Sequence, residues 1–148
     1  MELDLAKIKF CLDKLSSKTI PKWGLMNSSQ MLYHCNTFIE VSNGTKKVNF
    51  ISKIIGRLFG NFYLKSLDLD ILNFKKNSAT LKIFKSFPSS ISFIDQKEKL
   101  IKFFEKVQNP DNKIISHQLY GNISNDLFRK LVNFHTSYHF NQFGILSI

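Results

Sequence analysis

Three histidines, His34, His135 and His139, are the residues of this chain whose type and spacing best fit metal chemistry. His135 and His139 are four positions apart, so on a helix both side chains project from one face, with β-carbons about 6 Å apart. At that separation both imidazoles can reach one divalent ion at the ~2.0–2.1 Å distance of a zinc–nitrogen bond. The HTSYH segment at 135–139 therefore predicts part of a metal site.

The apolar residues around the histidines indicate that all three face a protein core. His135 and His139 extend an apolar stripe of the last predicted helix, and His34 lies within a similar stripe on another helix. The apolar neighbours are Met31, Phe38, Val41, Phe128, Leu131 and Val132. Buried imidazoles need partners that offset their desolvation, and one shared cation would satisfy all three rings. We therefore predict a three-histidine site for a divalent metal.

Three neutral nitrogen ligands leave one coordination position open, which is typical of catalytic rather than structural zinc sites. An ion held in this way can lower the pKa of a bound water or thiol and can polarise a carbonyl. Imidazole suits Zn, Ni, Cu and Fe alike, so the identity of the metal stays open, with zinc and nickel expected first.

Two residues near the pair on the last helix are assigned supporting roles. Gln142, at i+3 from His139, stays on the face of the site and is expected to orient a bound water or substrate. Tyr138 is offset from that face, and we expect it to pack at the edge of the site.

The two cysteines and the fourth histidine are predicted to lie outside the ligand set. Cys35 is rotated about 100° from His34 on a helix and is expected to be a packed thiol. Cys11 and Cys35 form no CxxC pair, so both are expected to be reduced. His117 lies in the loop SHQLYG and is expected to be exposed or to stabilise a turn.

Helices must position these side chains. Apolar residues at helical spacing predict four helices. The predicted helices span 3–15, 27–43, 95–107 and 124–143. Asn27 with Gln30, and Asp95 with Glu98, each predict a capping box at a helix start.

The stretch from Thr45 to Pro88 has a less clear pattern. Residues 51–62 follow helical spacing, are interrupted by Gly56 and Gly60, and belong to a segment, 46–65, that is rich in Lys and Arg. Such a basic amphipathic helix can lie on an anionic membrane surface. We expect it instead to cover a core, because the glycines weaken a free-standing helix. Residues 66–94 are expected to form a crossover that is rich in loops.

Composition predicts one domain over residues 1–148, since a chain of this length with 43% apolar residues can bury a substantial core. The net charge of +10 favours anionic partners, but the lysines are spread over nearly every segment, so a solvated basic surface is preferred to nucleic-acid binding. The acidic start of the chain is unlike a signal peptide, and no apolar run approaches the ~18 residues of a membrane span. A cytoplasmic protein without a membrane segment is expected.

Three segments resemble motifs of the DinB/YfiT-like superfamily of metal-dependent proteins. They are WGLMNSSQMLYHC at 23–35, HQLYGNIS at 117–124 and LVNFHTSYHFNQFGI at 131–145, and the most similar branch is one of unknown function. The resemblance implies an all-α fold, an up-down-down-up four-helix bundle with a long crossover between helices 2 and 3, and often a homodimer. It also implies that His34, His135 and His139 hold the metal.

The chain departs from the pattern of that branch at three positions. Ser137 stands where an acidic residue is common, Tyr138 replaces a histidine, and Asn141 replaces an arginine. These changes leave the ligands intact but alter the groups that tune the metal and contact a substrate.

The resemblance implies a metal-dependent enzyme, because characterised relatives include bacillithiol S-transferases and a mycothiol-dependent isomerase. The expected activity is transfer of a low-molecular-weight thiol, or hydrolysis, on a small-molecule substrate. Two alternatives stay open: a non-catalytic, metal-stabilised helical bundle that acts in stress response, and a membrane-surface or nucleic-acid binder that uses the basic segment 46–65.

Overall fold

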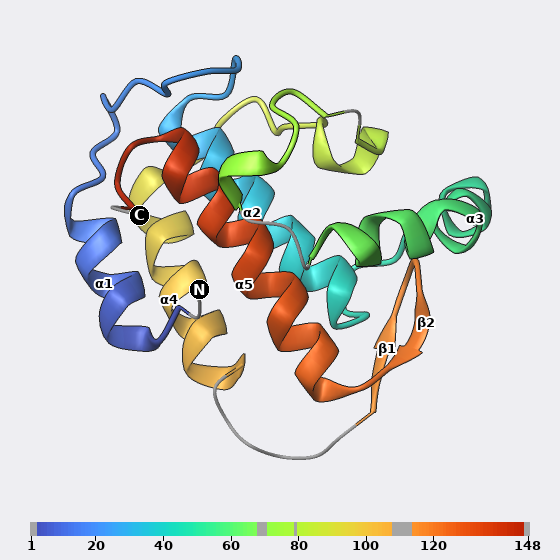
Figure 1. The fold of residues 1–148 in the computed structure, drawn as a ribbon. Coiled ribbons are helices and arrows are strands. Elements are labelled where there is room, and N and C mark those ends of the chain that lie inside the picture. Colours follow the sequence, from blue (N-terminus) through green and yellow to red (C-terminus); the bar gives the residue numbers. More distant parts are fainter. Residues whose placement is uncertain (1–2, 68–70, 79, 108–113, 147–148) are drawn as a thin grey trace.

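The computed structural model describes residues 3–67, 71–78, 80–107 and 114–146, which are mostly helical (Figure 1). The α-helices are α1 (Leu5–Asp13), α2 (Ser28–Ser42), α3 (Phe50–Ser66), α4 (Phe93–Val107) and α5 (Asn125–Gln142). Two short 3-10 helices, η1 (Ile71–Asn73) and η2 (Lys82–Phe84), lie in the crossover between α3 and α4. A two-stranded antiparallel sheet, β1 (Ile115–His117) and β2 (Gly121–Ile123), precedes α5. The prediction of a largely helical chain is thus confirmed, with a small sheet added.

Local sequence signals set the starts of the two helices that carry the histidines. The Asn27 side chain accepts a hydrogen bond from the Gln30 N–H at 2.9 Å, and the Gln30 side chain accepts one from the Asn27 N–H at 3.0 Å. This is the predicted capping box of α2. Ser124 caps α5, since its hydroxyl accepts from the Leu127 N–H at 3.2 Å. Both predicted starts are confirmed.

The start of α4 differs from the prediction. The helix begins at Phe93, and the Ser92 hydroxyl accepts a hydrogen bond from the Asp95 N–H at 3.3 Å. Asp95 therefore lies in the first turn, where its charge is favourable near the helix N-terminus. The predicted cap at Asp95 is wrong because Ser92 offers a cap three residues earlier and brings Phe93 into the helix, where it packs against the core.

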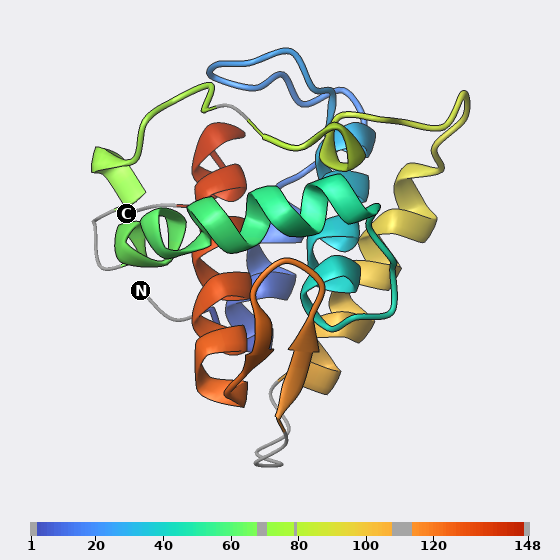
Figure 2. The same cartoon turned by 90° about the vertical axis from the view of Figure 1, so that its right-hand side faces the viewer.

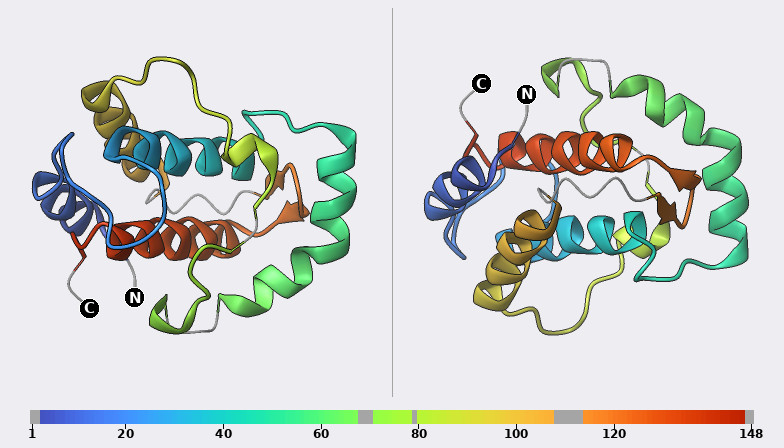
Figure 3. Two further views of the ribbon diagram at one scale, coloured as in Figure 1. Left: turned by 90° about the horizontal axis from the view of Figure 1, so that it is seen from above. Right: turned by 90° about the horizontal axis from the view of Figure 1, so that it is seen from below.

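The core lies among α1, α2, α4 and α5. Helix α2 contacts both α4 and α5, and α1 packs against α4. The view from above in Figure 3 shows α2 and α5 running side by side. Among the largest fully buried side chains are Ile8, Leu12, Met31, Leu32, Leu100, Phe104, Leu131 and Phe140. This packing fixes the spacing between the two helices that carry the histidines.

Helix α3 lies on the outer side of the molecule and crosses α2 and α5 (Figure 2), and its Tyr63 and Leu64 pack against the core. Its inner side meets the turn of the hairpin through two glycines. A Cβ at Gly56 would lie 2.7 Å from the Leu119 Cβ, and one at Gly60 would lie 2.6 Å from the Tyr120 Cδ1. The absence of side chains at these two positions therefore allows the close packing of α3 on the hairpin.

The predicted helix over 51–62 is confirmed, but its predicted role is wrong. The segment was expected to cover a core, whereas Phe50, Leu58 and Phe59 are 76%, 71% and 66% exposed. The glycines that interrupt the apolar pattern make the contact with the body, so the apolar residues on the opposite side point outward. None of the described helices is both long and apolar enough to cross a membrane.

The hairpin before α5 was predicted only as a loop. Ile115 pairs with Ile123 and His117 pairs with Gly121, whose φ of 78° supplies the left-handed turn residue. Each strand has three residues, which is too short for an alternating pattern to be visible in the sequence. The predicted crossover over 66–94 contains η1, η2 and the start of α4 among its described residues.

Candidate metal centre

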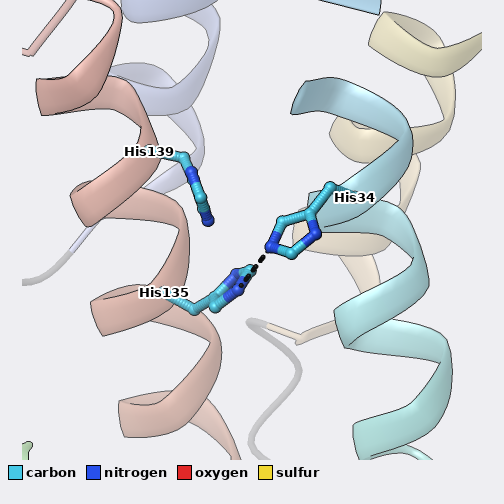
Figure 4. A group of neighbouring side chains, drawn as sticks. All are labelled: His34, His135 and His139. Atoms are coloured by element: carbon cyan, nitrogen blue, oxygen red, sulfur yellow. Dashed lines mark hydrogen bonds between the residues drawn. The ribbon is translucent and has the colours of Figure 1, made fainter. Parts of the chain in front are cut away.

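The three predicted ligands face one another in the space between α2 and α5 (Figure 4). His34 comes from α2, and His135 and His139 come from α5. One ring nitrogen from each lies within 4.8 Å of the others, and the Nε2 atoms of His34 and His135 are 3.1 Å apart. Within the described part of the chain, this is the group of side chains that could hold a metal ion.

Two of the three rings are anchored by their outer nitrogens. The Nδ1 of His34 is 2.8 Å from the Phe84 carbonyl oxygen, which can only accept, so Nδ1 carries the proton. The Nδ1 of His139 is 2.7 Å from the Oε1 of Gln142, and the Nε2 of that amide donates to the Trp23 carbonyl oxygen at 2.7 Å. Both histidines therefore donate from Nδ1 and present a bare Nε2 toward the other rings. Such outer anchors are typical of metal-ligating histidines.

The third ring is held by stacking rather than by a second hydrogen bond. His135 lies flat on Phe38, with ring centroids 3.7 Å apart and planes inclined by 4°. Its Nδ1 is buried without a hydrogen-bond partner, and because the Nε2 of His34 is bare, the Nε2 of His135 must donate the 3.1 Å bond between them. A shift of the proton from Nε2 to the unpartnered Nδ1 frees the Nε2 lone pair and leaves the ring and its stack in place. His135 can thus adapt to an ion that the other two rings are already oriented to bind.

The separations also fit one ion after a small contraction. Ligands at ~2.0–2.1 Å from a tetrahedral ion lie about 3.4 Å from one another. The 3.1 Å pair is already near that value, whereas a separation of 4.8 Å has to shorten by about 1.4 Å. Side-chain rotation of His135 or His139 supplies a movement of that size.

Burial keeps the three imidazoles neutral. His34 and His139 are each 6% exposed. Desolvation lowers the pKa of all three rings from 6.5, to about 3 for His139 despite its hydrogen bond to Gln142. The neighbouring imidazoles lower the pKa of His135 further. A metal binds the neutral form of imidazole. None of the three histidines therefore has to release a proton before it binds a metal at neutral pH.

A cavity of about 250 Å³, which none of the three histidines lines, shares Tyr138 with their surroundings. Aromatic rings and two cations line it, among them Lys22, Trp23, Phe74, Lys76 and Tyr138. Tyr138 joins the cavity to the site, since its ring also meets His139 edge-on, with centroids 5.1 Å apart. The predicted position of Tyr138 at the edge of the site is therefore confirmed. His135 remains partly exposed, so the histidine group is not sealed from solvent.

The other candidate ligands lie away from the three histidines. Cys35 is fully buried, its Sγ contacts the Met31 Sδ at 3.8 Å, and burial raises its pKa, so it is the predicted packed thiol. His117 stabilises the hairpin turn, as its Nδ1 accepts from the N–H groups of Leu119 and Tyr120 at 3.0 and 3.3 Å. Of the two expected roles, stabilising a turn is thus confirmed, while the ring is buried instead of exposed, and this burial lowers its pKa to about 4.

Sequence reasoning missed two contributors to the site. The Phe84 carbonyl comes from the crossover, and a backbone acceptor leaves no residue-type signal. Phe38 was recognised as apolar but not as the stacking partner of His135, although both residues lie on the inward faces of their helices. Gln142 lies on the predicted face, where its amide holds His139.

The chain matches no model of a known protein family, no curated protein and no solved structure.

Proposed function

We propose that this protein is a divalent-metal-dependent enzyme of the DinB/YfiT-like type, with His34, His135 and His139 as the metal ligands. The observation that carries the proposal is the pair of fixed tautomers: Phe84 and Gln142 hold the outer nitrogens of two histidines, so their inner lone pairs converge with the third ring. A buried cluster of neutral imidazoles without an ion would gain little from this arrangement.

The ligand set suits zinc or nickel, and the other residues of the site have passive roles. An ion with three neutral nitrogen ligands and an open position would supply Lewis acidity, lowering the pKa of a bound thiol or water. Gln142 orients His139, and Phe38 keeps the ring of His135 in plane. His135 is partly exposed, so one side of the group contacts solvent.

The neighbouring cavity favours a thiol substrate that carries negative charge. Lys22 and Lys76 supply cations, and the Lys76 Nζ lies 4.7 Å from the centroid of the Trp23 ring. Tyr138 lines this cavity and contacts His139, so a molecule bound there would lie next to a proposed ligand. Low-molecular-weight thiols with carboxylate groups match this combination of aromatic surface and cations.

The family-level fold belongs to the same proposal. The packing of α1, α2, α4 and α5 around one core, with a crossover of short elements between α3 and α4, supports an up-down-down-up four-helix bundle. The long crossover of that bundle would then include α3 as an additional helix.

A thiol-transfer assay tests this function. Protein purified without a histidine tag is stripped of metal, reloaded with Zn²⁺ or Ni²⁺, and mixed with a chloronitrobenzene electrophile and one of several thiols, including cysteine, glutathione, coenzyme A and bacillithiol. We expect metal-dependent thioether formation with one thiol class and its loss in His139→Ala. Lys76→Gln should raise KM for that thiol while changing kcat little.

A non-catalytic, metal-stabilised protein is the second candidate. It is favoured by the composition of the group, which contains histidines without Asp, Glu or Cys among the described residues, so the chain offers no acid or base of its own there. If the metal raises the melting temperature but no thiol or ester is turned over, this candidate replaces the enzyme.

A further inference from the structure

Helix α3 presents an apolar face to solvent. Its exposed large side chains are Phe50, Ile51, Ile54, Ile55, Leu58 and Phe59. At 100° per residue these positions cluster on one side of the helix, whereas Gly56 and Gly60 lie on the opposite side, against the hairpin. Soluble monomeric proteins rarely expose a continuous apolar patch of this kind, and such patches mark interaction surfaces.

Cations border this apolar face. Residues 50–66 include Lys53, Arg57 and Lys65 and contain no Asp or Glu. Lys47 precedes the helix and, with Lys82, lines a cavity of about 320 Å³ at its N-terminal end. The surface therefore combines apolar side chains with positive charge and has no acidic residue of its own.

Three occupants can be compared by charge and shape. A second copy of this chain would place the cations of one α3 against those of the other, and each chain carries a net charge of +10. A nucleic acid would pair with the cations but leave the apolar side chains in water. An anionic lipid surface satisfies both, because the lysine and arginine stems can extend to phosphates while the apolar groups enter the headgroup region.

The position of the helix is compatible with a flat partner. Figure 2 and both views of Figure 3 show α3 on the periphery of the molecule, with the other elements on one side of it. Its apolar face can therefore meet a plane without obstruction by α2 or α5.

We propose that the protein docks on anionic phospholipid bilayers through the exposed face of α3. The apolar side chains of Phe50, Leu58 and Phe59 insert at the headgroup level, and the exposed Arg57 and Lys65 pair with lipid phosphates. This docking is independent of the metal site.

Vesicle co-sedimentation of the full chain tests the proposal. Vesicles of phosphatidylcholine alone are compared with vesicles that contain increasing fractions of phosphatidylglycerol. Binding should rise with the anionic fraction and weaken with added salt. The Leu58→Ser/Phe59→Ser variant should bind more than about tenfold more weakly. Arg57→Gln/Lys65→Gln should lose about fivefold per cation.

A matched control uses exposed apolar residues elsewhere. Phe10 and Leu25 are exposed in α1 and in the segment before α2, so Phe10→Ser/Leu25→Ser should bind vesicles like the natural sequence. Three results would overturn the proposal: no sedimentation with anionic vesicles, equal binding of the Leu58→Ser/Phe59→Ser variant, or a dimer in solution that this variant dissociates. The last result would assign the face to a second copy.

Discussion

The space between α2 and α5 and the outer face of α3 depart from the usual distribution of side chains in opposite directions. Between α2 and α5, three imidazoles are placed where apolar side chains are the rule, and two of them are 6% exposed. On α3, Leu58 and Phe59 stand in water, where polar side chains are the rule. The N-terminus of α5 is capped by Ser124, and that of α3 is capped by Asn49.

We infer from this difference that the two regions bind partners of different chemistry. Buried imidazoles lose hydration that an ion can replace, and exposed apolar side chains order water that a lipid surface can release. Departures from the hydrophobic pattern concentrate at functional sites in natural proteins. We therefore propose a metal-binding region between α2 and α5 and a separate surface-binding region on α3, and each can be disturbed alone.

The largest effect is expected from the loss of one proposed ligand. His139→Ala should weaken metal binding by more than about 100-fold, since removal of an outer hydrogen-bond partner alone costs 10–100-fold. Titration of metal-free protein with Zn²⁺ measures the affinity. His117→Ala is the control: it should keep the metal affinity while destabilising the hairpin. Equal losses in both variants would contradict the assignment.

Acid should destabilise the metal-free protein through its buried histidines. Their pKa values are lowered from 6.5 in the folded chain, so the unfolded chain binds more protons as the pH falls below about 6.5. Stability is therefore full above pH 6.5 and is lost toward the folded values of about 4 for His117 and 3 for His139. Each histidine contributes up to about 1.4 kcal/mol per pH unit.

Urea unfolding at several pH values between 7.5 and 4.5 measures this slope. A His117→Gln variant should reduce the slope of stability against pH by the contribution of one histidine. Helix α3 contains no His, Asp or Glu, so we expect it to contribute nothing to the pH dependence of stability over this range. A stability that is constant over this range would contradict neutral, buried imidazoles.

A smaller effect is expected when the anchor of His139 is removed. Gln142→Leu deletes the acceptor of the His139 Nδ1–H and should weaken metal binding by about 10–100-fold. Gln142→Glu keeps an acceptor but loses the bond to the Trp23 carbonyl, so it should retain the affinity for the metal. Calorimetric titration of both variants separates the two bonds. If Gln142→Leu binds like the natural sequence, the amide has no part in the site.

The smallest effects compare the two sides of α3. Gly56→Ala places a Cβ 2.7 Å from the Leu119 Cβ and should cost about 1–3 kcal/mol of stability. Leu58→Ala, two residues away on the exposed side, should change stability by less than about 0.5 kcal/mol. Denaturant unfolding of the two variants measures the difference. A larger loss at Leu58 would mean that the apolar face packs on the body.

Much of the fold and of the site could be predicted because the signals were local. The cap at Asn27, the cap at Ser124 and the spacing of His135 and His139 each depend on residues within one or two helical turns. The inward direction of His34 followed from the apolar stripe around it.

The remaining features depend on contacts between distant segments. The 3-10 helix η2 brings the Phe84 carbonyl to His34, and nothing in the sequence marks a backbone oxygen as an anchor. The orientation of α3 depends on which side meets the hairpin. The side with Gly56 and Gly60 meets the hairpin because only residues without a side chain fit there. Hydrophobicity alone predicted that the apolar side of α3 would face the core.

X-ray absorption spectroscopy of the metal-loaded protein, purified without a histidine tag, identifies the ligands of the ion and so tests whether His34, His135 and His139 form a metal site. We expect one ion per chain, bound by three imidazole nitrogens and a light-atom ligand from solvent, with one imidazole fewer in His135→Ala. An ion that binds with sulfur ligands, or with fewer than three imidazoles in the natural sequence, would contradict it.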